Sequence, residues 1–152
     1  MLRLSKKLLF AIEAVVDIAY NAGAAPVRSS DISERQGIPR RYLEQVLQVL
    51  VHRGILAGQR GPRGGYRLAR ERRHIAIGDI VRIVRELEGG IELGDGEEGS
   101  ELGQAVVRPI WVQMQDDMME RLDSITVEDL CNQARQAGIR SQATPVVTDF
   151  SI

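Results

Sequence analysis

Arginine is the residue type in the first half of the chain whose abundance indicates a binding function. Residues 1–75 contain 12 Arg and 2 Lys against 6 Asp and Glu, a net charge of +8, whereas residues 76–152 contain 6 Arg against 15 Asp and Glu, a net charge of −9. Guanidinium groups bind phosphate and guanine in a bidentate geometry. The charge pattern therefore favours a polyanion as partner, although a basic face that is only solvated would give the same pattern.

Other residue types argue against an enzyme or a metalloprotein. Cys131 is the single cysteine, so the chain can form neither an internal disulfide nor a metal site of several cysteines. His52 and His74 have no Cys, Asp or Glu at metal-site spacing and are expected at the surface. Residues 61–65 are rich in glycine but lack the Gly-Lys-Ser or Gly-Lys-Thr of a phosphate-binding loop. With no activated nucleophile and no carboxylate pair in a motif, we predict no enzymatic activity.

Length and composition are those of an ordinary globular protein. The chain has 152 residues, of which 43% are hydrophobic and 27% charged, which suits one domain or a small domain with an accessory segment. It contains no run of 18 apolar residues, so no transmembrane helix and no membrane partner are expected. The first 20 residues do not form a secretory signal, which makes the cytoplasm the expected compartment.

Three helices are predicted before residue 55. Ser5 can cap the first. Its apolar residues recur every three or four positions: Leu8, Ile12, Val15, Val16 and Ala19. The second helix lies between Ser29 and Gly37, and the third has Pro39 as its first residue and ends at Gly54. Two helices joined by so short a turn are typical of a helix-turn-helix, although a plain three-helix bundle would also keep its polar residues outside.

The third helix is predicted to be amphipathic, as a recognition helix must be. One stripe is apolar and should face the core: Tyr42, Leu43, Val46, Leu47 and Leu50. The outer side is polar and should face solvent or DNA: Arg40, Arg41, Glu44, Gln45 and Gln48. The short turn and the basic flanks favour DNA binding over a plain bundle.

A β-hairpin is predicted directly after this helix. Residues 55–60 and 66–69 have the pattern of short strands, and residues 61–65 form the turn between them. A hairpin in this place is the wing of a winged helix. Arg60, Arg63 and Arg67 lie on or beside its tip, where arginine suits the negative potential of a narrow minor groove and glycine lets the backbone approach it.

The second half is predicted to be helical. A fourth helix begins within residues 75–80 and ends at residues 89–90, and an acidic, glycine-rich loop covers residues 89–101. A long helix follows over residues 102–123, in which Pro109 marks either a kink or the start of the regular part. A last helix, capped by Thr126 with Asp129 three residues on, ends near Gly138.

The long helix carries an apolar stripe with no partner of matching length in so short a chain. The stripe contains Leu102, Val106, Ile110, Trp111, Met114, Met118 and Leu122. Self-association would bury it, and we expect a homodimer, with some packing against the first helix of the same chain. The predicted fold is therefore mainly α. Residues 1–75 form a winged helix-turn-helix DNA-binding domain with a two-stranded wing, residues 76–138 a dimerisation and effector region, and residues 139–152 a tail.

Three stretches carry a resemblance to a known family. The segment at residues 31–38, Asp-Ile-Ser-Glu-Arg-Gln-Gly-Ile, the Tyr-Leu-Glu-Gln at 42–45, and the Arg-Gly-Pro-Arg-Gly-Gly-Tyr at 60–66 together closely resemble the Rrf-two family of bacterial transcription regulators. The resemblance covers roughly residues 2–138. It implies a homodimer on palindromic double-stranded DNA, with the recognition helix in the major groove and the wing in the minor groove.

The resemblance also implies which residues contact DNA. Arg41, Glu44 and Gln45 fall on base-reading positions, where Glu44 can accept from a cytosine amino group and Gln45 can pair with adenine, while Arg60 falls on the wing contact. The full predicted set is Ser29, Arg40, Arg41, Tyr42, Glu44, Gln45, Gln48, Arg60, Pro62, Arg63, Gly64 and Gly65.

No cofactor is predicted. Relatives that bind an iron–sulfur cluster have three cysteines and a histidine, whose places correspond here to Leu93, Gly99, Ala105 and Arg108, none of which can ligate iron. Cys131 is expected to be a small buried apolar residue. We therefore predict a cluster-free, homodimeric repressor. The effector, a small molecule, a partner protein or a thiol change at Cys131, stays open. The alternative function is a protein-interaction module that signals through a partner protein.

Overall fold

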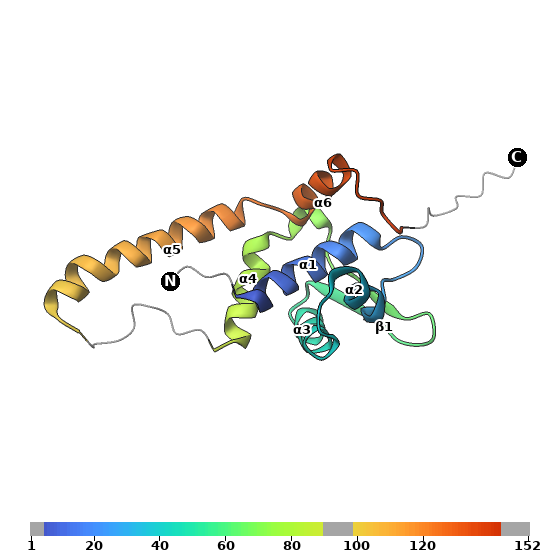
Figure 1. Cartoon of the computed structure of the whole chain (residues 1–152), viewed down its shortest axis with the longest axis horizontal. Coiled ribbons are helices and arrows are strands. Elements are labelled where there is room, and N and C mark those ends of the chain that lie inside the picture. The colour runs from blue at the N-terminus through green and yellow to red at the C-terminus, as the bar shows by residue number, and fades with distance from the viewer. Residues whose placement is uncertain (1–4, 90–98, 144–152) are drawn as a thin grey trace, which may run out of the picture.

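The computed structural model places a helix-turn-helix and a two-stranded wing where the sequence predicts them (Figure 1). It describes residues 5–89 and 99–143, so most of the predicted acidic loop lies outside the described residues. The elements of the first half are α1 (Lys6–Asn21), α2 (Ser29–Gln36), α3 (Arg40–His52), β1 (Leu56–Gln59) and β2 (Gly65–Leu68). The 3₁₀ turn η1 (Arg72–His74) ends the first half. The elements of the second half are α4 (Ile77–Leu87), the π-helical turn η2 (Gly103–Val107), α5 (Arg108–Asp123) and α6 (Val127–Gln136).

Helix α1 lies at the centre of one hydrophobic core. It packs against α2, α3, α4 and α6, so the core takes residues from both sides of residue 75. Ala11, Ala14 and Ile18 of α1 are fully buried, whereas the predicted core residues Ile12 and Val16 are only half-buried. The small side chains of Ala11 and Ala14 let neighbouring helices approach α1 closely, and this is why its buried face differs from the predicted stripe.

A buried ion pair joins α1 to α2. The carboxylate of Asp17 is inaccessible to solvent and accepts hydrogen bonds from Arg35 Nε at 2.9 Å, Arg35 Nη2 at 2.7 Å and Gln36 Nε2 at 2.8 Å. The hydrogen bonds to Asp17 raise the pKa of Arg35 above its ordinary value. Because both carboxylate oxygens are satisfied, the pair fixes the position of α2 on α1.

The turn between α2 and α3 depends on one glycine. Gly37 ends α2 with a φ of 65°, in the left-handed region that favours glycine. Pro39 is the residue that precedes α3 and not its first residue, a shift of one position from the prediction. At the other end of α3, Gly54 N–H donates to Val51 O at 3.1 Å and Ile55 N–H to Leu50 O at 3.0 Å. Together with the positive φ of Gly54, these bonds form a Schellman motif that ends the helix.

Helix α5 extends away from the body of the molecule as an arm (Figure 1). Ser100 caps the helical segment that leads into it, since its hydroxyl accepts from Gly103 N–H at 3.1 Å. The π-helical turn η2 comes next, and regular α-helix starts at Arg108 with Pro109 in its first turn, as the position of that proline predicts. Only the C-terminal end of α5 packs against α4 and the core.

Two contacts fix the base of this arm. Arg82 of α4 binds both carboxylate oxygens of Asp123, at 2.8 and 2.6 Å. Gly78 lies against the same carboxylate, because a Cβ added at Gly78 would lie 1.9 Å from Asp123 Oδ1. The predicted capping box of Thr126 and Asp129 then starts α6. The base of the arm is thus held to α4 by direct polar contacts.

The beginning of the predicted tail contacts α1. Tyr20 of α1 donates a hydrogen bond through its hydroxyl to the Ile139 carbonyl. Ser141 Oγ donates back to Tyr20 O at 2.5 Å, and Gln142 N–H donates to Asn21 Oδ1 at 2.9 Å. Residues 144–152 lie outside the described part of the chain.

Candidate nucleic-acid interface

The outer face of α3 carries the polar residues that the sequence assigns to DNA. Four residues of the helix are fully buried: Leu43, Val46, Leu47 and Leu50. The residues between them are exposed: Arg40, Arg41, Glu44, Gln45 and Gln48. All five therefore lie on one solvent-facing side of the predicted recognition helix, which is long enough to enter a major groove.

Of the two arginines at the start of α3, only Arg40 has an ion-pair partner among the described residues. Arg40 Nε lies 3.5 Å from Glu44 Oε1, one turn along the helix, and both side chains are more than half exposed. Arg41 has no ion pair or hydrogen bond among the described residues. An exposed pair of this kind is weak, so Arg40 and Glu44 can separate when other partners approach.

Tyr42 joins α3 to α1. It is half-buried, its hydroxyl donates to Lys7 O at 2.6 Å, and its ring lies 6.2 Å from that of Phe10. Desolvation, and next to it the charge of Glu88, raise the pKa of Tyr42 to about 12. Tyr42 therefore holds α3 against α1, and its contact with DNA stays a prediction.

The wing is a short antiparallel hairpin with an exposed tip. Leu56 pairs with Leu68, and Gln59 pairs with Gly65. Residues 60–64 join the strands, with Gly61 at a φ of 105° and a hydrogen bond of 2.9 Å from Gly64 N–H to Gly61 O. The predicted contact residues of the tip, Arg60, Pro62 and Arg63, are exposed.

Two glycines of the wing serve the fold. A Cβ on Gly64 would lie 2.2 Å from Gln59 O, and a Cβ on Gly65 would lie 2.5 Å from Val27 O. Both distances are shorter than van der Waals contact with backbone atoms, so no larger residue fits without moving the chain. The prediction placed these glycines at the DNA, but their close backbone neighbours belong to the wing and to the loop before α2.

Arg67 is also placed differently from its prediction. It lies in β2, and its guanidinium donates to Gly23 O at 2.6 Å and to Ala24 O at 2.7 Å. These carbonyls belong to the loop after α1. Arg67 thus joins the wing to α1, and the prediction that it lies beside the wing tip is wrong.

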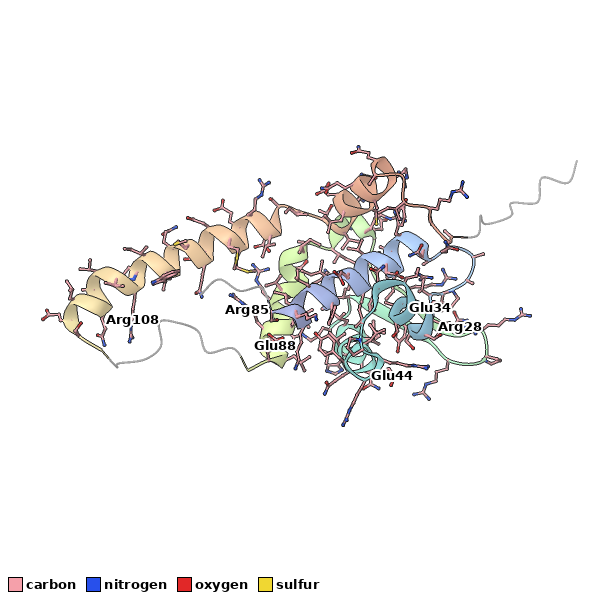
Figure 2. All side chains as sticks on the ribbon, in the orientation of Figure 1. Arg28, Glu34, Glu44, Arg85, Glu88 and Arg108 are labelled. Carbon is pink, nitrogen blue, oxygen red and sulfur yellow. The ribbon has the colours of Figure 1, made fainter. Side chains whose placement is uncertain are left out.

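An open hollow of about 620 Å³ separates the wing from α2 and α3. The predicted residues Ser29, Arg40, Gln48 and Arg60 line it, together with Arg28, which sequence reasoning missed. Arg28 directly precedes α2 (Figure 2). Its Nη2 donates to Pro62 O at 2.7 Å. The sequence shows Arg28 only as one of many basic residues, because its contact depends on a residue 34 positions away.

The predicted dimerisation stripe is largely exposed on the arm. The exposed members are Leu102, Val106, Ile110, Trp111 and Met114, with exposed fractions from 41 to 68%. Met118 is half-buried, and Leu122 packs against the core of its own chain. Leu122 is therefore an intrachain contact. The free part of the stripe ends near Met118.

The residues at the places of a cluster's ligands do not fit an iron–sulfur cluster. A Cβ on Gly99 would lie 3.1 Å from Arg108 Nη2, so a cationic guanidinium lies directly beside Gly99. Ala105 is exposed on η2, and Leu93 lies outside the described residues. Without thiolates, and with a fixed positive charge there, these positions cannot hold iron.

The remaining candidate ligands lie apart from these positions. Cys131 is fully buried on α6, where burial raises the pKa of its thiol, and His52 and His74 are exposed, as predicted. In residues 5–89 and 99–143 no group of three or more His, Cys, Asp and Glu side chains could bind a metal ion. Among the helices of the described residues, none has the length and apolar character needed to cross a membrane.

Comparisons with known proteins agree with this geometry. The family model Rrf2, described as an iron-dependent transcriptional regulator, matches residues 4–133. The transcriptional regulator IscR of Pectobacterium carotovorum is 36% identical over 132 residues, which cover 86% of this chain and 80% of the relative.

Solved structures give the same result. The IscR structure from T. potens is 36% identical with a TM-score of 0.74, over 92% of this chain and 93% of that one. The structure of CymR, described as the global cysteine regulator of B. subtilis, is 32% identical with a TM-score of 0.71. The match covers 88% of this chain and 98% of that one. The chain belongs to the Rrf2 family of DNA-binding transcription regulators, which are not enzymes.

Proposed function

We propose that this regulator is a homodimeric repressor that binds a palindromic operator. The polar face of α3 enters the major groove, and Arg60 and Arg63 of the wing reach the adjacent minor groove. The observation that carries the proposal is the exposure of Arg41, Glu44 and Gln45 on one side of α3, beside an exposed arginine-bearing wing. Occupying the operator then blocks transcription, in the cytoplasm, where we place the protein with its DNA.

The exposed arm supports the homodimer. Ile110 is 57% exposed and Met114 is 42% exposed, although apolar residues of this size are normally buried. Two copies of α5 packed together would bury both stripes. A twofold axis through that contact would present two recognition helices to the two halves of a palindrome.

We further propose that this member works without an iron–sulfur cluster. The support is the guanidinium of Arg108 beside Gly99, together with a single, buried cysteine. A small molecule or a partner protein would then supply the signal. Cys131 is a poor thiol sensor, because its raised pKa keeps the thiol protonated at neutral pH.

The test is DNA binding at several salt concentrations. Footprinting on the DNA upstream of the regulator's own gene would identify an operator, and titration would follow on that duplex and a scrambled one. We expect tighter binding to the operator, with log Kd rising linearly with log salt concentration. A protein that bound neither duplex in a salt-dependent way would instead be an interaction module acting through a partner protein.

A further inference from the structure

The wing is attached to the rest of the protein through Val27 and Arg28, which precede α2. Val27 and Tyr66 exchange two backbone hydrogen bonds, of 3.0 and 2.7 Å, and Gly65, the first residue of β2, packs directly on the Val27 carbonyl. At the tip, Arg28 Nη2 donates to Pro62 O at 2.7 Å. Consecutive residues, Val27 and Arg28, therefore hold the start of β2 and the tip loop that leads into it.

The tip needs an external contact to keep one position. Residues 60–64 join two strands of four residues each and include Gly61 and Gly64. Two glycines in a short loop allow many backbone conformations. Within the described part of the chain, the bond from Arg28 is the only side-chain hydrogen bond between these five residues and another element.

Arg28 is itself held by the rigid part of the molecule. It directly precedes α2, and α2 is fixed to α1 by the buried pair of Asp17 and Arg35. The same helix continues through a short turn into α3. A link from Arg28 to Pro62 thus sets the position of the wing tip relative to the recognition helix.

We propose that Arg28 is a positioning residue for DNA binding, which holds the wing tip at the distance from α3 that a major groove and its neighbouring minor groove require. The inference rests on the proposed function, because it assumes that the wing contacts DNA. A tip that is ordered before binding loses less conformational entropy on the operator, and so binds more tightly.

A direct phosphate contact is the competing role. Arg28 lines the open hollow together with Arg40 and Arg60, so its charge could also attract the DNA backbone. The two roles predict different behaviour of the wing tip in the DNA-free protein. Only a positioning role changes the mobility of the wing tip when no DNA is present.

The experiment compares the full-length wild type with Arg28→Ala, Arg28→Lys and the control Arg63→Gln. Trypsin cuts after Arg60 and Arg63, so the rate of cutting in the free protein reports tip mobility. We expect Arg28→Ala to raise that rate about 3- to 10-fold, because this is the effect of losing one hydrogen bond. Arg28→Lys keeps a donor at this position and should restore most of the protection. Thermal melting should be nearly unchanged, since Arg28 is exposed.

Operator binding completes the test. We expect Arg28→Ala to raise the operator Kd about 3- to 10-fold with little change in salt slope, whereas Arg63→Gln should lower the slope by about one unit and leave cutting at Arg60 unchanged. The proposal would be overturned if trypsin cut Arg28→Ala no faster than the wild type. It would also be overturned if Arg28→Ala lowered the salt slope of operator binding by about one unit while the tip stayed protected from trypsin. If the wild type itself bound no operator, the proposed function would fail while the trypsin result still stood for the contact alone.

Discussion

Arg40 and Gln45 lie on the same exposed side of α3, but their chemistry suits different parts of DNA. Arg40 lies at the first position of the helix and beside the hollow under the wing, where the phosphate backbone would pass. Gln45 lies one to two turns further along, where an amide can pair with the edge of adenine. Arg40 should therefore contribute affinity for any DNA duplex, and Gln45 should contribute selectivity for the operator sequence.

The prediction is a difference between two alanine variants. Arg40→Ala should weaken binding to all sequences alike and lower the salt slope by about one unit. Gln45→Ala should cost about 1–3 kcal/mol on the operator and little on scrambled DNA. Titration of both variants on both duplexes at several salt concentrations gives the comparison. Equal losses on the two duplexes for Gln45→Ala would place the recognition surface elsewhere.

Tyr42 provides a test of stability against pH. Its raised pKa of about 12 means that the folded state favours the protonated phenol. The stabilisation is fully present below the ordinary pKa of a tyrosine, about 10, and is lost as pH rises through about 12. Tyr42→Phe should cost about 0.5–1.5 kcal/mol at neutral pH, through the lost bond to Lys7, and should reduce the loss of stability in alkali. Urea unfolding of both proteins at pH 7 and pH 11 measures this, and parallel losses in alkali would contradict it.

At the scale of elements, the wing depends on one close approach of two backbones. Gly65→Ala would push a methyl group to within 2.5 Å of Val27 O, so the strand must move. We expect a loss of about 1–3 kcal/mol of stability and weaker operator binding. Gly58→Ala is the matched control in the partner strand, since its Cβ would meet nothing closer than Tyr66 Cε1 at 3.9 Å. Chemical unfolding of both variants measures the difference, and two equal losses would show that strand glycine in general is responsible.

Elements governed by local chemistry could be predicted from the sequence, and contacts between distant residues could not. Ser5, Gly37, Gly54 and Thr126 mark helix ends in the structure as they do in the sequence, because caps depend on neighbouring residues. The polar face of α3 follows in the same way from the helical period.

The contacts that the sequence did not predict have the opposite cause. The partners of Tyr42 and Arg67, which are Lys7 and the loop after α1, lie 35 and 44 positions away. The role of Gly65 likewise depends on Val27, from another segment. Such contacts appear only once the chain is folded.

At the scale of the whole molecule, we expect the exposed arm to determine whether the protein is a monomer or a dimer. Ile110→Glu with Met114→Glu would place four like charges in the seam of the proposed dimer, so light scattering should report monomers. Val112→Glu is the control, because two residues of helix place Val112 about 200° around the axis from Met114. This variant should stay dimeric. A wild type that is monomeric at micromolar concentration would end the dimer proposal.

Metal content is a second property of the whole molecule. Protein purified without oxygen should be colourless and contain no stoichiometric iron or acid-labile sulfide, since Gly99 and Arg108 replace ligands and Cys131 is buried. Elemental analysis and visible absorption check this. A visible absorption band from sulfur-to-iron charge transfer would contradict this prediction. It would show that side chains other than those at the predicted ligand positions hold the metal.

The single core around α1 has a consequence for DNA geometry. Direct packing joins α2 and α3 to the base of the arm, because α1 packs against α2, α3 and α4, and α4 holds α5 through Arg82 and Asp123. In a dimer joined by its arms, the separation of the two recognition helices is then a fixed length. One additional base pair between half-sites would turn one of them by about 34–36° around the duplex. A rigid dimer could not follow that rotation, so we expect the proposed dimer to select its operator by the spacing of the half-sites as well as by their bases.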